Sequence, residues 1–149
     1  MRSLITISPD VTLSSPAMNM IDSSVVVKDG VAFARVADCD GADVLLKFSQ
    51  DNLAAWDGRE ILLGIRPEAI TDPDGADRNS KNIVPLRNQI VVIEPAGADT
   101  FVTMTLGGKD TIARMRADAT VGPGEMFDFA VNMEKAVAFD PKTEERIAP

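Results

Sequence analysis

The sequence predicts an all-β fold, either a small barrel or a pair of barrels, with short connecting helical turns. Three observations lead to this fold class. Runs of β-branched or apolar residues of strand length follow one another, turn signals separate them, and little of the chain has a helical period. The 149 residues suit one domain or two small joined ones, and the hydrophobic content of 45% is enough for a packed core.

Each expected strand is a run of apolar or β-branched residues. These runs span residues 24–28, 31–37, 43–48, 61–65, 83–93, 100–106, 111–116, 126–131 and 136–139. Asp29-Gly30 is the strongest short hairpin signal, because this dipeptide suits a two-residue turn. Pro85 lacks a backbone N–H, so its run is expected to start as an edge or a bulge. Trp56, the only tryptophan, closes an expected helical turn and is predicted to fill the core.

The run at residues 61–65 is bounded by turn formers and is typical of a strand buried on both faces. Arg66 precedes a proline and is therefore pushed towards extended geometry, while Pro67 removes the next donor of the ladder. The strand must stop where Arg66 and Glu68 are presented. Taken alone, this corner is a solvated charge pair at a strand end.

Residues 71–82 are almost wholly polar and rich in turn formers, which predicts an exposed, mobile loop. The loop divides the chain into two expected lobes, approximately residues 24–70 and 83–149, whose ends can cross between them. Three apolar residues after a Ser-Pro turn are also expected in the core, namely Met18, Met20 and Ile21.

The composition argues against several partners. The formal charge of −8 and the pI near 4.5 disfavour a nucleic-acid backbone or an anionic lipid surface, since both attract basic proteins. Cys39 is the only cysteine, which excludes an intrachain disulfide and fits a reducing compartment. No apolar run is long enough for a spanning helix. We therefore expect a cytoplasmic protein with no nucleic-acid partner and no direct membrane insertion.

The residues offer no visible apparatus for catalysis. Histidine, the commonest general base and zinc ligand, is absent. Gly108-Lys109 matches part of a phosphate-binding loop, but Thr103 and Asp110 stand where a glycine and a hydroxyl residue are needed. The acidic stretches 38–43 and 72–77 fail as calcium loops, because their glycine arrives two positions early, and turn chemistry explains both. We expect no catalytic, cofactor-binding or metal-ligating residue, although the 23 acidic residues leave a carboxylate-only hydrolase as an open alternative.

Four motifs resemble, in order, the C-terminal regulatory region of the ATP-binding subunits of sugar-importing ABC transporters. The maltose and glycerol-3-phosphate importer ATPases are the most similar groups. The motifs are Ser15-Pro16-Ala17-Met18-Asn19, Leu63-Gly64-Ile65-Arg66-Pro67-Glu68, Glu94-Pro95-Ala96-Gly97-Ala98-Asp99-Thr100 and Phe139-Asp140-Pro141-Lys142-Thr143. The resemblance covers residues 14–149, whereas residues 1–13 form a lead-in that does not match.

The resemblance implies lobes of OB-like (TOBE/MOP-like) β-barrel type and a chain from which the ATPase domain is absent. It implies a non-catalytic regulatory domain that helps to hold two ATP-binding subunits together. Self-association and contact with ATPase and permease subunits would follow, at the inner face of the membrane. ATP and magnesium would bind the missing ATPase domain, so no cofactor is expected on this chain.

Two corners form the candidate interface, because glycine and proline allow a partner's backbone to approach closely. The candidate residues are Gly64, Arg66, Pro67, Glu68, Pro95, Gly97 and Asp99. The alternative is that these glycines only serve their own turns.

A small-oxyanion binder is the alternative function, because related barrel modules of molybdate transport and storage proteins bind such ions. An acidic domain without a basic cluster is a poor anion trap, although backbone N–H groups at turns could suffice. Saturable heat on titration with molybdate or tungstate would favour this alternative. The sequence does not identify the transported solute.

Overall fold

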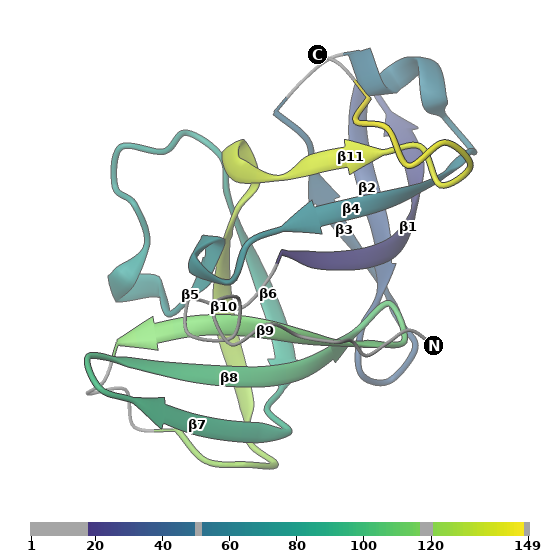
Figure 1. Ribbon diagram of the computed structural model, residues 1–149. Helices are drawn as coiled ribbons and strands as arrows, with labels where there is room; N and C mark the ends of the chain where they lie inside the picture. Colours follow the sequence, from purple (N-terminus) through teal and green to yellow (C-terminus); the bar gives the residue numbers. More distant parts are fainter. Residues whose placement is uncertain (1–17, 50–51, 117–120, 148–149) are drawn as a thin grey trace.

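The computed structural model describes residues 18–49, 52–116 and 121–147. This part of the chain consists of β-strands and short 3₁₀ turns (Figure 1), so the predicted all-β fold class is confirmed. The strands are β1 (Asn19–Lys28), β2 (Val31–Ala37), β3 (Asp43–Lys47), β4 (Glu60–Ile65), β5 (Ile70–Thr71), β6 (Ile83–Gln89), β7 (Val92–Ala96), β8 (Asp99–Leu106), β9 (Lys109–Arg116), β10 (Met126–Asn132) and β11 (Val137–Phe139). The turns are η1 (Asn52–Trp56), η2 (Pro67–Ala69), η3 (Pro73–Gly75) and η4 (Met133–Lys135).

The strands form three antiparallel sheets with the orders β11-β4-β1-β2-β3, β5-β10-β6 and β7-β8-β9. The Asp29-Gly30 hairpin joins β1 to β2, and both turn residues have positive φ, 52° and 79°, as a two-residue turn of this kind requires. β4 lies between β1 and β11, and its Ile61, Leu63 and Ile65 are buried. The predicted strand is confirmed, but its burial on both faces is confirmed only in part, because these three side chains share one face and Leu62 on the other is half-buried.

Each half of the chain contributes a strand to a sheet of the other half. β11, from the end of the described chain, pairs with β4 through Ala138 and Leu63, and Figure 1 shows the two strands side by side. β5, from the first half, pairs with β10 through Ile70 and Val131. A single cluster of buried apolar side chains includes residues of both halves. The two halves are thus interlocked.

The strand period of two decides which apolar residues reach the core. In β8 the buried positions alternate with half-buried ones. In β1, Ile21 is fully buried, but the neighbouring Met20 is 37% exposed. The expectation that Met20 packs in the core is wrong, because Met20 falls on the outward-facing register of the strand.

The apolar run expected at residues 83–93 is two strands in different sheets. β6 pairs with β10, whereas β7 pairs with β8. Ile90 and Val91 carry the chain between them, and the Val91 N–H donates to the Thr103 carbonyl at 2.8 Å. Pro85 lies in β6, which is an edge strand of its sheet, as predicted.

The polar segment at residues 71–82 is anchored at both ends. The Arg116 guanidinium lies 3.1 Å from the carboxylate of Asp72, whose side chain is only 7% exposed. At the other end, Asn82 Nδ2 donates to the Lys47 carbonyl at 2.9 Å. The exposed middle agrees with the prediction, but the anchored ends do not fit a freely mobile linker.

Ser80 ties this segment to η4. Its hydroxyl donates to the Glu134 carboxylate and lies 2.8 Å from Asn132 Oδ1, and the Lys81 N–H donates to the same carboxylate at 3.0 Å. The Ser80 bond, followed by the Lys81 bond, lowers the pKa of Glu134 from its usual 4.5. The native contacts therefore favour the charged form of Glu134.

We expect the folded chain to lose a small part of its stability in acid through this group. A carboxyl whose pKa is lowered by folding stabilises the fold above its unfolded pKa of 4.5, and the contribution is lost as the pH falls through the lower folded value. Ser80→Ala should reduce this loss, whereas Ser24→Ala, whose hydroxyl accepts from Arg35, should keep it. Urea unfolding at about pH 6 and about pH 3.5 measures the difference. Equal acid sensitivity in Ser80→Ala and the wild type would contradict this role.

Candidate functional site

The first predicted corner is the end of β4. Arg66 has extended backbone, with φ −74° and ψ 150°, as expected for a residue before proline. Pro67 then begins η2, in which the Ala69 N–H donates to the Arg66 carbonyl at 2.9 Å. Arg66 is exposed, Glu68 is half-buried and Pro67 is buried. The corner therefore presents charge, while its proline packs inside the chain.

Gly64 is also a packing position inside the chain. It pairs with Met20 of β1 on one side and with Val137 of β11 on the other. A methyl group on Gly64 would lie 2.6 Å from Met18 Sδ and 2.9 Å from a ring carbon of Phe139. The space beside Gly64 is filled by the chain itself and is not open to a partner.

The second predicted corner is the hairpin that joins β7 to β8. Gly97 has a positive φ of 69° in a turn closed by the Ala96 and Asp99 pair. A methyl group on Gly97 would meet nothing within 4 Å, so only the backbone conformation favours glycine. Pro95 and Gly97 are exposed and Asp99 is half-buried. The two corners belong to different sheets, and this one lies on the surface.

Polar contacts hold the third sheet against the first. The Asn19 side chain donates to the Ile112 carbonyl and accepts from the Ile112 N–H, both at 2.9 Å, so it pairs as a strand residue would. At the tip of the β8–β9 hairpin, the Gly107 N–H donates to the Ala37 carbonyl at 2.7 Å. A methyl group on Gly107 would lie 2.8 Å from a methyl carbon of Ile21, so glycine permits the close approach.

Asn88 makes a further connection between sheets. It is fully buried, its amide oxygen accepts from the Cys39 N–H at 3.1 Å, and its amide nitrogen donates to the Thr105 carbonyl at 2.9 Å. The roles of Asn19 and Asn88 cannot be read from the sequence, because a buried asparagine in a strand has no local signal. Their backbone partners are far away in the sequence.

Three apolar side chains are exposed around the start of β7. Val91 is 48% exposed, Val92 is 46% exposed, and Met126, which begins β10, is 42% exposed. We call these three residues the β7 patch. The sequence placed both valines in one apolar run over residues 83–93, but the chain changes sheet at Ile90 and Val91, and both valines are exposed. Val92 and the exposed Pro95 both lie in β7.

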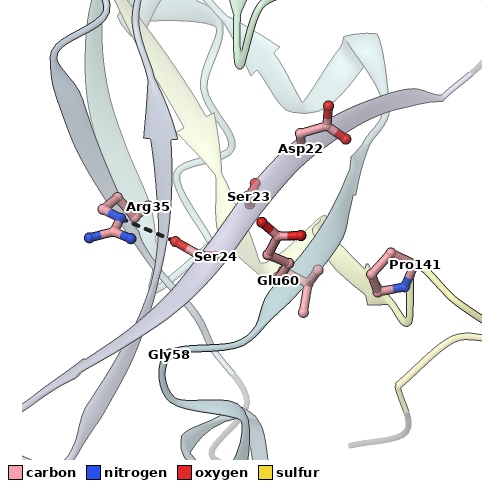
Figure 2. A pocket seen from close by; sticks show the side chains of 8 residues that line it. Asp22, Ser23, Ser24, Arg35, Gly58, Glu60 and Pro141 are labelled. Atoms are coloured by element: carbon pink, nitrogen blue, oxygen red, sulfur yellow. Dashed lines mark hydrogen bonds between the residues drawn. The ribbon is translucent and has the colours of Figure 1, made fainter.

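A polar groove of about 530 Å³ runs over β1, β2 and β4 (Figure 2). Its polar side chains come from Asp22, Ser23, Ser24, Arg35 and Glu60. Several are already bound within the chain: Arg35 Nε donates to the Ser24 hydroxyl at 3.1 Å, and the Ser23 hydroxyl donates to a carbonyl of its own strand. Because the chain has no histidine, these serines lack the commonest base for nucleophilic chemistry.

The acidic turn between β2 and β3 is explained by its own backbone. Oxygen and sulfur atoms of Asp38, Cys39 and Asp40 lie within 4.8 Å of one another. The Asp38 carboxylate accepts from the N–H groups of Asp40 and Ala42, both at 2.9 Å. This is the turn chemistry that the sequence predicts.

The fold defines a small all-β module built of three antiparallel sheets. Among residues 18–49, 52–116 and 121–147, no helix is long and apolar enough to cross a membrane. Two family models match the chain, a MalK OB fold domain over residues 15–70 and a TOBE domain over residues 63–139. The chain therefore belongs to the TOBE domain family, as the motifs predicted.

Curated relatives are import ATP-binding proteins. The sn-glycerol-3-phosphate import ATP-binding protein UgpC of Yersinia pestis is 31% identical over 137 residues, which are 92% of this chain and 34% of that protein. The trehalose/maltose import ATP-binding protein MalK of Thermococcus litoralis is 27% identical over 136 residues, or 88% of this chain and 34% of that protein. The chain spans about a third of their length and matches their C-terminal part.

A solved structure shares the fold. The cytoplasmic molybdate-binding protein ModG, with molybdate bound, superposes with a TM-score of 0.55 at 16% identity, covering 84% of this chain and 97% of that one. At this identity the likeness shows the fold alone.

Proposed function

We propose that the chain is a non-catalytic regulatory and dimerisation domain of the ATP-binding subunit of an ABC importer for sugars or glycerol-3-phosphate-like solutes. The observation that carries this proposal is the match to the C-terminal third of import ATP-binding proteins. The parent protein would be a transport-coupled ATPase that works with permease subunits at the cytoplasmic face of the membrane. This domain would contribute binding surface, and ATP and magnesium would bind elsewhere.

The β7 patch and the second corner are the surface that we assign to self-association. Val91 and Val92 are exposed near the start of β7, and Pro95 and Gly97 are exposed at its other end, and exposed apolar side chains that gather on one surface are typical of interaction sites. A two-fold arrangement would repeat the same patch on both subunits. At the first corner, Arg66 and Glu68 remain candidate contacts. At the second corner, Asp99 remains a candidate contact. Gly64 and Pro67 pack inside the chain, so we do not keep them as candidate contact residues.

We expect weak self-association that rises with salt, because a net charge of −8 repels a second copy and salt screens that repulsion. Val92→Arg should lower the association constant by about tenfold, since it places a charge in the apolar contact. The matched control is Ala42→Arg, which makes the same charge change at an exposed turn on another sheet. Sedimentation velocity over a concentration series, at low and high salt, measures both.

The positive charge that both variants introduce makes the comparison more informative. Each variant reduces the net negative charge, which by itself favours association, so weaker association of Val92→Arg alone would implicate the β7 patch. Equal behaviour of the two variants would remove the patch from the proposal. A wild-type chain that stays monomeric at every salt concentration would overturn self-association of this domain.

A further inference from the structure

A hollow of about 310 Å³ lies where the segment at residues 71–82 covers β9 and β10. Its apolar lining comes from Ala69, Ile83 and Ala130, which are small or half-buried and leave room above the sheet. This volume is at the lower end for small-molecule sites, which span roughly 300–1,000 Å³. The hollow can therefore admit a ligand of monosaccharide size.

Charged side chains of both signs surround the hollow in two mixed pairs. Glu68 of η2 and Arg114 of β9 belong to elements that pack against each other. Asp77 and Lys135 lie on the η4 side. The Ser80 N–H donates to the Asp77 carbonyl at 3.1 Å while the Ser80 hydroxyl donates to Glu134 of η4, so Asp77 lies near η4. Each side of the hollow thus offers one hydrogen-bond acceptor and one donor, and the four charges sum to zero.

Most of the charged side chains around the hollow can still form hydrogen bonds with a ligand. Among the described residues, none forms an ion pair with Glu68, Arg114 or Lys135, although Glu68 and Arg114 are half-buried. A charged group that is partly removed from water and unpaired favours a ligand that replaces the lost hydrogen bonds. The buried Asn132 adds an amide to the same lining.

We propose that this hollow binds a small neutral polyol, with a monosaccharide as the upper size. A hydroxyl group can donate to a carboxylate while it accepts from a guanidinium or ammonium group, so neighbouring hydroxyls match the mixed pairs on both sides. Because the four charges sum to zero, the lining gives no net attraction to an anion or to a cation. The site belongs to this chain alone and does not depend on the proposed function in an importer.

The first measurement is a titration of the full ¹⁵N-labelled chain followed by amide NMR spectra, with D-glucose as the neutral probe. D-glucose 6-phosphate and D-glucosamine serve as the matched anion and cation. Saturable shifts with D-glucose, centred on Thr71, Ala76 and Asn132, are expected at millimolar concentrations. Shifts elsewhere only, no saturation, or a clear preference for either charged sugar would overturn the proposal.

Two substitutions of opposite charge then test the chemistry. Glu68→Gln and Arg114→Gln should each weaken D-glucose binding by about tenfold, because each removes a charge-assisted hydrogen bond to a hydroxyl. An anion site would instead bind more tightly after Glu68→Gln, and a cation site more tightly after Arg114→Gln. Either increase would overturn the neutral class.

Arg87→Gln is the matched control, since Arg87 is an exposed strand residue that pairs with Asp128 on the surface outside the hollow. Its D-glucose affinity should stay within about twofold of the wild type. An equal loss in Arg87→Gln would show a general charge effect and would overturn the site. If a charge variant does not fold, Ala76→Phe decides the question. It narrows the hollow without a charge change and should abolish binding, and retained binding would overturn the proposal.

Discussion

Asn19→Ala should destabilise the fold by about 2–4 kcal/mol, because it leaves the N–H and the carbonyl of Ile112 without partners at a partly buried site. Both groups bond to the Asn19 amide at 2.9 Å, and Asn19 itself is 8% exposed. The lost hydrogen bonds connect β1 to β9, so the contact between the third sheet and the first should also weaken. Urea unfolding gives the free energy, and hydrogen exchange of the Ile112 amide reports the joint.

Asn79→Ala is the control, because Asn79 is an exposed turn residue. Its unfolding free energy should remain within about 0.5 kcal/mol of the wild type. Asn19→Asp provides a second check, since the introduced carboxylate keeps the acceptor but faces the Ile112 carbonyl with a negative charge. Its stability should recover partly in acid, where the protonated group can donate again. Unchanged exchange of the Ile112 amide in Asn19→Ala would contradict the assigned role.

Gly64→Ala should cost about 2 kcal/mol through overpacking. A methyl group would lie 2.6 Å from Met18 Sδ, 2.9 Å from Phe139 and 3.0 Å from Val137. The flexible Met18 can move, but the Phe139 ring and the branched Val137 sit on β11, so we expect this short strand to separate from β4. Urea unfolding and amide exchange along β11 measure the effect.

Gly122→Ala is the matched control. A methyl group there would come no closer than 3.7 Å to a side chain, so the change should be neutral or stabilising by up to about 1 kcal/mol. Opposite signs at the two glycines would show that packing, and not the general cost of replacing glycine, decides the result. Similar effects at both positions would argue against the tight contact at Gly64.

The sequence predicted the strands well, because strands in this chain are short alternating runs between strong turn formers. The Asp29-Gly30 hairpin and the corner at Arg66 and Pro67 follow from backbone sterics alone, and both were confirmed. Met20 was misplaced, since apolar character does not show which register of a strand faces the core.

The surfaces were harder to predict than the strands. The run that includes Val91 and Val92 looks continuous, and only its pairing with two different partners reveals the change of sheet. Gly64 and Gly97 look alike in the sequence, yet one is enclosed by neighbouring strands and the other is open to solvent. The hollow beside Arg114 is lined by residues from elements that are distant in the chain, so no local sequence pattern predicts it.

The exchange of strands between the halves has a consequence for synthesis on the ribosome. β4 keeps one edge unpaired until β11 emerges, more than seventy residues later, and β5 must wait for β10. Pairings over such distances form late, because loop closure must be completed before the contacts contribute. The nascent first half should therefore expose the unpaired edge of β4 until β11 has been made, and an unpaired strand edge in an incomplete chain favours aggregation.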